Sequence, residues 1–304
     1  MGVPREPFAL DRGLRVRMVL ALVVNGVLIA AAVGMLAWLV VFVDSESAYV
    51  LLFIALFAAV GTSTAARRPR RARAASEADR ARLETSIVRL AVLADIPPPV
   101  AHVQSDVVPL SWTHSTLWHR PQIYVTTALL DALSDRDLDA VVAHEIAHIQ
   151  NRDAVVMTLL SAPSTWILRG TRRMWEMRRE DWRLGPSLIM FAWTWVPFAA
   201  ILAVMTYVVS RHRELAADRG AALLIGSPAR VATVLSRLAG DIRSIPTRDL
   251  RLAGTTDTLH LLPARKHEQR GISRLWATHP SLATRLEQLE RLESELQRLG
   301  GNSA

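Results

Sequence analysis

Two histidines four residues apart, His144 and His148, flank the sequence Glu145-Ile146-Ala147. On a helix, residues i and i+4 project from the same face, so both imidazoles can bind one metal ion. Glu145 stands next to the first histidine, where its carboxylate can take a proton from a water that the metal holds. These residue types at this spacing predict metal-assisted hydrolysis, with Glu145 as the general base.

A helix must carry this motif, and the flanking sequence predicts one from about Asp135 to Arg152. Ser134 and Asp137 stand three residues apart, which resembles an N-terminal capping box. Apolar residues follow at helical spacing, namely Leu138, Val141, Val142, Ile146 and Ile149. The alternative is that two of the nine histidines share a helix by chance, as buried or surface residues.

Two histidines leave a catalytic zinc one protein ligand short. The chain has no cysteine, so the third ligand must be a histidine or a carboxylate. The metzincin pattern is excluded, because Asn151 and Ala154 occupy its glycine and third-histidine positions. A glutamate from a second helix is the remaining common solution, and Glu214 is the best candidate. Asp218, one turn later on the same face, can accept a hydrogen bond from a ligand histidine.

Other interpretations of the carboxylates stay open. Glu214 and Asp218 also fit an ordinary solvated helix face whose carboxylates pair with arginines. Glu176 and Glu180 are weaker ligand candidates, because they lie in a charged stretch with no orienting carboxylate at helical spacing.

The composition indicates membrane segments. The 304 residues are 51% hydrophobic, and the mean hydropathy is +0.21. Residues 18–43 form an apolar run broken by Asn25, which is long enough to cross a hydrocarbon core. After an acidic linker at 44–47, residues 48–66 form a second run. Together the two runs predict an N-terminal transmembrane hairpin, 18–66.

The net charge of +8 comes almost entirely from arginines that cluster beside the apolar runs. They precede and follow the hairpin as Arg5, Arg12, Arg15, Arg17, Arg67, Arg68, Arg70, Arg71 and Arg73. The positive-inside rule therefore predicts that both ends of the hairpin are cytoplasmic, beside anionic lipid headgroups. A nucleic-acid patch is the alternative, but no aromatic residues are interleaved with the arginines, so we expect no nucleic-acid partner.

Two further hydrophobic stretches follow, at about 154–168 and 187–210, with an arginine-rich loop at 169–183 between them. They can be a pair of spans, a re-entrant hairpin or helices on the membrane face, and the sequence does not decide between these. Because residues on both sides must meet at one metal, the number of crossings is even.

The remaining segments predict a mainly α fold with a small β-sheet. Amphipathic or leucine-rich helices are expected at 76–94, 221–239 and 281–299, and short strands at 100–104, 107–112 and 123–126. The predicted organisation is a cytoplasmic N-terminus (1–17), the hairpin, a basic linker with an amphipathic helix (67–99), and a zincin-like metallopeptidase domain (100–304) that the hydrophobic pair interrupts.

At this level of detail the chain resembles the membrane metallopeptidases of the HtpX and CaaX-prenyl-protease kind. The resemblance rests on the hairpin and on three motifs, AHEIAHIQNRD (143–153), SRHRELAADRGAA (210–222) and THPSLATR (278–285). It implies a gluzincin-type zinc endopeptidase that holds one zinc ion per chain through His144, His148 and Glu214, with Glu145 as base.

The third motif carries two further implied site residues, His279 and Arg285. In the family they line the active site, where a donor histidine and a guanidinium suit stabilising the oxyanion or orienting the third ligand. The chain departs from the family at 109–113, where an Asn-Ala-Phe-Ala-like strand is replaced by Pro-Leu-Ser-Trp-Thr. A strand here can still pair with substrate backbone, but the asparagine contact is lost.

The sequence thus predicts a multi-pass protease of the cell membrane whose catalytic domain faces the cytoplasm. The resemblance implies polypeptide substrates, namely misfolded or regulatory membrane proteins, as in HtpX-like quality control. Two other classes are the alternatives: an inactive zinc-binding scaffold or regulator, which would not need Glu145, and an ion transporter, which would need more polar residues than Asn25 inside the first hairpin. The oligomeric state is left open.

Overall fold

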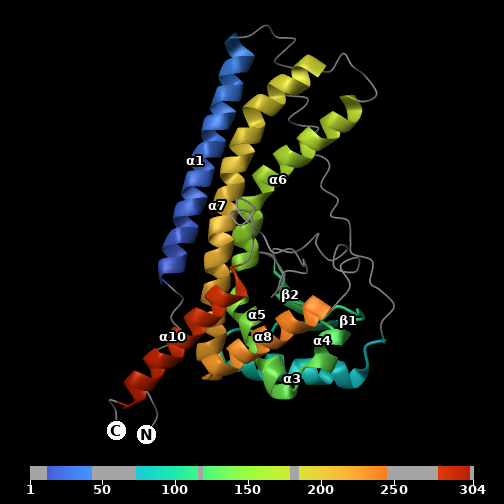
Figure 1. The fold of residues 1–304 in the computed structure, drawn as a ribbon. Helices are drawn as coiled ribbons and strands as arrows, with labels where there is room; N and C mark the ends of the chain where they lie inside the picture. The colour runs from blue at the N-terminus through green and yellow to red at the C-terminus, as the bar shows by residue number, and fades with distance from the viewer. Residues whose placement is uncertain (1–11, 43–72, 116–118, 179–184, 245–279, 302–304) are drawn as a thin grey trace. The chain divides into compact units, whose positions relative to one another are not determined.

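The structure is a computed structural model that describes residues 12–42, 73–115, 119–178, 185–244 and 280–301 (Figure 1). The chain divides into two units. We call the first the mixed unit; it comprises Met1–Arg15, Ala66–Val155 and Ser210–Ala304 and contains the described β-sheet. The second, the helical unit, comprises Val16–Ala65 and Val156–Val209. The prediction of a mainly helical fold with a small sheet is confirmed.

Three short strands form the sheet of the mixed unit: β1 (Val100–Gln104), β2 (Ser111–His114) and β3 (Gln122–Thr126). Their order is β1-β3-β2, with β1 parallel and β2 antiparallel to β3. β2 therefore forms one edge of this sheet, and its backbone is fixed on one side by the ladder to β3.

The strands predicted at 100–104 and 123–126 are confirmed, whereas the strand expected at 107–112 begins later, at Ser111. The Asp106 carboxylate accepts a hydrogen bond from the backbone N–H of Val108 at 3.0 Å, which bends the chain before the strand. Pro109 follows and has no N–H for a ladder. These residues delay the strand, so that Ser111 and Thr113 enter the ladder in place of Val107.

One helix, α3 (Glu77–Leu93), precedes the three strands in the sequence. Two helices, α4 (Thr127–Ala132) and α5 (Asp135–Gln150), follow them. The amphipathic helix predicted at 76–94 is α3, and a capping box of Ser76 and Asp79 begins it. Ser134 is the N-cap of α5, and its hydroxyl accepts from the N–H of Asp137 at 3.3 Å. The helix ends at Gln150, two residues before the predicted end, because Arg152 takes a left-handed φ of 55°.

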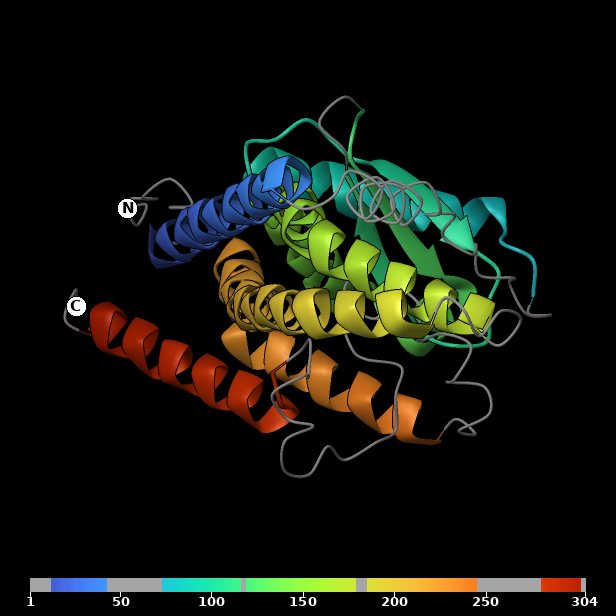
Figure 2. The same cartoon turned by 90° about the horizontal axis from the view of Figure 1, so that it is seen from above.

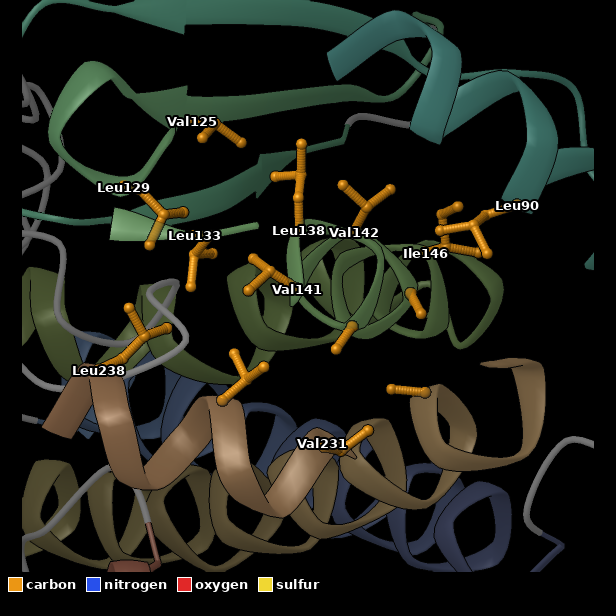
Figure 3. Packing of buried hydrophobic residues seen from close by; sticks show 14 of the residues in the cluster. Leu90, Val125, Leu129, Leu133, Leu138, Val141, Val142, Ile146, Val231 and Leu238 are labelled. Atoms are coloured by element: carbon orange, nitrogen blue, oxygen red, sulfur yellow. The ribbon is translucent and has the colours of Figure 1, made fainter. Parts of the chain in front are cut away.

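The core of the mixed unit is built around α5, which lies between the sheet and α3 on one side and α8 (Pro228–Ser244) on the other (Figure 3). Leu138 and Val142 point from α5 toward the sheet, and Ile146 lies beside Leu90 of α3. Burial of each such side chain contributes about 1.5–3 kcal/mol. The helix with the two histidines is therefore held by apolar contacts on opposite sides.

The helix predicted at 221–239 is instead two helices, α7 (Gly185–Ile225) and α8. Gly226 takes a φ of 68°, and the N–H of Ser227 reaches back to the carbonyl of Ala222 at 3.0 Å, as in a Schellman C-cap. Pro228 then occupies the first position of α8, and the Ser227 hydroxyl accepts from the N–H of Arg230 at 3.3 Å. The last helix, α10 (Leu282–Gly301), packs on α8.

The helical unit contains most of α1 (Arg12–Phe42) and α6 (Asp153–Arg178) and the first part of α7, which lie side by side in both views (Figures 1 and 2). The carbonyl of Leu160, three residues before Pro163, accepts hydrogen bonds from the Asn25 amide at 3.4 Å and from the Thr206 hydroxyl at 3.1 Å. Asn25, the polar interruption of the first apolar run, thereby joins α1 to α6.

The prediction of a loop at 169–183 is wrong over its first part, because α6 continues through Arg178. Residues 48–66, the second half of the predicted hairpin, lie outside the described residues. Within the described ranges, one helical segment, Trp195–Ile225, is long and apolar enough to cross a membrane, and a shorter apolar segment is Val16–Leu28.

Candidate metal centre

Three potential metal ligands converge inside the mixed unit: His144 and His148 from α5, and Glu214 from α7. The two Nε2 atoms lie 3.0 Å apart. The Glu214 carboxylate lies 3.8 Å from Nε2 of His144 through Oε2 and 3.7 Å from Nε2 of His148 through Oε1. All three side chains are buried. Two histidines four residues apart on one helix and a carboxylate from a second helix thus meet at one point.

The spacing of these atoms suits a tetrahedral zinc ion. Zinc binds histidine nitrogen and carboxylate oxygen at about 2.0–2.2 Å, which separates neighbouring ligand atoms by about 3.3 Å. The observed separations of 3.0, 3.7 and 3.8 Å lie on either side of that value. Two imidazoles and one carboxylate are also the donor set of a catalytic zinc site that keeps one position open.

Asp218 lies one turn beyond Glu214 on α7, and its Oδ1 atom is 3.1 Å from Nδ1 of His144. This is the histidine nitrogen that faces away from the metal position, as the sequence predicts for an orienting carboxylate. Arg285 of α10 donates to both oxygens of Asp218, at 2.6 Å each, and its Nη1 atom lies 3.9 Å from Oε2 of Glu214. The guanidinium is buried, and two of its hydrogen bonds go to Asp218.

His148 has a corresponding carboxylate that the sequence reasoning missed, Asp153. Its Oδ2 atom lies 2.6 Å from Nδ1 of His148. Burial lowers the pKa of His148 well below its ordinary value, and the nearby His144 acts in the same direction. The neutral imidazole, which is the form that binds metals, is therefore the favoured form. The turn at Asn151 and Arg152 brings Asp153 back to the histidine, so its five-residue spacing gives no helical signal.

Arg213 is the second buried residue that the sequence reasoning missed. Its Nη2 atom donates to Oε1 of Glu214 at 2.6 Å, and its Nε atom lies 4.0 Å from Asp153. Burial raises the pKa of the Asp153 carboxyl well above its ordinary value, and the charge of Arg213 opposes that rise. A charged residue next to Glu214 in sequence was the available signal, but arginines are too frequent in this chain for it to stand out.

Glu145 lies beside the three ligands on α5, and its side chain is 1% exposed. The Ser111 hydroxyl donates to Oε1 at 2.7 Å, and the Thr113 hydroxyl donates to Oε2 at 2.6 Å. Burial raises the pKa of the Glu145 carboxyl, and His144 and the two hydroxyl donors counteract part of that rise. Glu145 and His148 line a small pocket together with Thr113 and Arg213, so a water-sized group can approach both.

The other candidate site residues lie elsewhere in the chain. His279 and Glu180 fall outside the described residues. Glu176 lies on α6, within the helical unit. Among the described residues, the cluster of potential metal ligands is formed by His144, His148 and Glu214.

Comparisons with known proteins agree on one family. Residues 77–293 match the model described as Peptidase family M48, a range that includes every residue of the cluster. "Protease HtpX homolog 1" of Streptomyces coelicolor is 33% identical over 296 residues, which are 95% of this chain and 96% of that protein. "Protease HtpX homolog 2" of Methanosarcina acetivorans is 32% identical over 227 residues, 73% and 76% of the two chains. A crystal structure of S. mikatae Ste24p is more distant, with a TM-score of 0.44 and 16% identity over 90% of this chain and 67% of that one.

Proposed function

This chain belongs to peptidase family M48 and is a metallopeptidase, and from that premise we propose that it is a membrane-bound zinc endopeptidase of misfolded or membrane proteins. The observation that carries the proposal is the convergence of His144, His148 and Glu214 beside the buried carboxylate of Glu145.

His144, His148 and Glu214 are the residues that would hold one zinc ion per chain. When bound, zinc polarises the scissile carbonyl and lowers the pKa of water, as in other catalytic zinc sites. Asp218 and Asp153 fix the two imidazoles from their far nitrogens, so that each Nε2 atom faces the ligand position. Both supporting contacts come from buried carboxylates, which restricts rotation of the rings.

Glu145 moves the proton in the reaction. One of its carboxylate oxygens accepts the proton of the attacking water while the water oxygen bonds to the scissile carbon. The same proton then passes to the leaving nitrogen as the C–N bond breaks, which returns Glu145 to its ionised form. Its position on the pocket wall beside His148 supports this role.

The proposed roles of Arg285 and His279 rest on different observations. Arg285 acts through Asp218, because it donates a hydrogen bond of 2.6 Å to each oxygen of that carboxylate, and it is therefore a positioning residue. The role of His279 as a donor to the developing oxyanion rests on the resemblance of its motif alone.

The substrate backbone would add as a strand beside β2, which is an edge strand of the described sheet. In the described sheet β2 is bonded to β3 on one side only, and an extended peptide can pair with such an edge. Pairing with backbone atoms requires an unfolded segment but little sequence preference. This supports misfolded proteins as the substrate class, in keeping with the likeness to the HtpX homologs.

Membrane attachment is supported by the helical unit. Large apolar side chains there are 44–66% exposed, among them Val16, Val19, Leu20, Val23, Ile201 and Val204. An apolar surface of this kind favours lipid over water. Together with the arginine clusters beside the first apolar run, this supports a multi-pass protein of the cell membrane whose zinc site faces the cytoplasm.

The test uses the full-length chain purified in detergent, with zinc analysis and cleavage of fluorescein-labelled casein with and without chelator. We expect wild type to carry about one zinc per chain and to lose cleavage when the metal is removed. Glu145→Gln should keep the zinc and lose activity by about 10²–10⁴-fold, because an amide cannot accept the proton. A His144→Ala/His148→Ala variant is the zinc-free control. Cleavage by Glu145→Gln within tenfold of wild type would show that Glu145 is not the base.

A further inference from the structure

Two hydroxyls from one strand hold the carboxylate of Glu145. The Ser111 hydroxyl donates to Oε1 at 2.7 Å and the Thr113 hydroxyl to Oε2 at 2.6 Å, so each carboxylate oxygen has its own donor. The three side chains are at most 5% exposed. Hydrogen bonds to an ionised acceptor are about twice as strong as neutral ones, and exclusion of water strengthens them further.

The backbone of the sheet sets the position of these hydroxyls. Ser111 and Thr113 are two residues apart on β2, so both side chains point to the same face, toward α5, while Trp112 points to the other face. The ladder to β3 pairs Ser111 with Val125 and Thr113 with Ile123. A slip of one residue would bring Trp112 toward Glu145, so the register itself aims the two hydroxyls.

We propose that Ser111 and Thr113 are positioning residues for proton transfer: they clamp the Glu145 carboxylate in the orientation in which it takes and returns the water proton. The proposal rests on the assignment of Glu145 as the general base. A carboxylate has about four acceptor positions, two on each oxygen. The two hydroxyls occupy one position on each oxygen, which leaves one on each for water and prevents rotation of the group.

The clamp also ties the base to the substrate. β2 is the edge strand to which the substrate backbone would add, and the same strand carries both hydroxyls. The scissile bond and the base are thereby positioned by one short stretch of backbone. Small displacements in such an arrangement are costly, because a misplacement of about 1 Å can lower a rate by about 100-fold.

A purely structural role is the competing explanation, since a buried carboxylate needs donors wherever it lies. Ser86 provides a matched comparison: its hydroxyl donates at 2.7 Å to the Asp139 carboxylate, which is on α5 as well but outside the pocket. If the hydroxyls of β2 only satisfy a buried charge, their removal should resemble Ser86→Ala, with a loss of stability and no change in turnover by the folded enzyme.

The experiment measures kcat, KM, zinc content and thermal unfolding for the full-length zinc-loaded enzyme with fluorescein-labelled casein. The variants are Ser111→Ala, Thr113→Val, both together, Thr113→Ser and Ser86→Ala. For each single removal we expect kcat to fall about tenfold, and for both together about 100-fold, with KM within about twofold of wild type and zinc retained. Thr113→Ser should restore most of kcat, and Ser86→Ala should leave kcat unchanged.

The proposal is overturned if folded, zinc-loaded Thr113→Val and Ser111→Ala turn over like wild type, or if their defect lies in KM alone. If the alanine or valine variants do not fold, kcat of Thr113→Ser relative to wild type tests the proposal. A value below one tenth would show that a hydroxyl at this position does not restore kcat, which contradicts the clamp. Glu145→Gln distinguishes a failure of the clamp from a failure of the general-base assignment. If Glu145→Gln is active, Glu145 is not the general base. If it is inactive while the hydroxyl variants are fully active, only the clamp is refuted.

Discussion

The guanidinium of Arg285 makes two hydrogen bonds of 2.6 Å to the carboxylate of Asp218, and both side chains are at most 1% exposed. Because Asp218 also lies 3.1 Å from Nδ1 of His144, the last described helix, α10, reaches the metal cluster through one carboxylate. Arg285 of the C-terminal motif thus supports the ligand His144 through Asp218. Its substitution should therefore weaken metal binding more than it slows the chemical step.

Replacing Arg285 by alanine should weaken zinc binding by about 10–100-fold, as the loss of a contact that orients a ligand does. The free energy of unfolding should also fall by about 3–5 kcal/mol, because the substitution leaves the buried Asp218 charge without its cation. Competition with a zinc chelator and denaturant unfolding measure the two effects. Arg291→Ala is the control on the same helix, since that exposed arginine pairs with the exposed Glu287 one turn away and lies outside the metal cluster. Wild-type zinc affinity in Arg285→Ala would refute the link through Asp218.

Asp153 should matter for metal binding as much as Asp218, although it follows the motif by five residues. Asp153→Asn keeps the size of the side chain but replaces the carboxyl group beside Nδ1 of His148 with an amide. We expect zinc affinity to fall by about 10–100-fold, with the fold retained. Asp139→Asn is the matched control, because it changes a carboxylate of α5 that accepts a hydrogen bond from Ser86. Equal zinc affinities of the two variants would mean that Asp153 does not orient His148.

Glu214, and not Glu176, should supply the third ligand. Glu214→Ala should abolish zinc binding at micromolar free metal, because two imidazoles alone leave the site incomplete. Glu176→Ala should leave the zinc content at the wild-type level. Metal analysis after gel filtration measures both variants under the same conditions. The assignment fails if zinc is lost from Glu176→Ala and kept by Glu214→Ala.

Local patterns predicted the elements that depend on neighbouring residues. The i, i+4 histidines, the cap at Ser134 and the apolar spacing predict α5 within two residues, because a helix has one dominant period and an N-cap is a local contact. The same reasoning failed at Gly226, where a glycine, a serine and a proline in succession end one helix and begin another. That triplet was a readable signal, since glycine favours the left-handed C-cap and proline the first helical turn.

Contacts between distant segments were not predictable in this way. Ser111 and Thr113 lie more than thirty residues from Glu145 in sequence, and their hydroxyls meet it only because β2 begins after the bend at Asp106. The sequence shows that Ser111 and Thr113 would lie on one face of a strand, but it does not show which helix packs against that face. Asp153 was missed because a turn, rather than a helical period, returns it to His148.

The topology prediction follows from the shared metal cluster. His148 and Glu214 lie on either side of the hydrophobic stretches in the chain and converge in one unit, so an even number of crossings must separate them. The arginines on both sides of the hairpin predicted at 18–66 favour cytoplasmic ends for it. Reporters fused after Ser76 and at the C-terminus should therefore both report the cytoplasm, and a reporter after Ser47 should report the outside. Replacing Arg67, Arg68, Arg70 and Arg71 by glutamine should weaken this preference, because the rule counts positive charges near the span. A C-terminal reporter on the outer face, with the Ser76 reporter inside, would place the two halves of the metal cluster on opposite sides of the membrane and so refute the site.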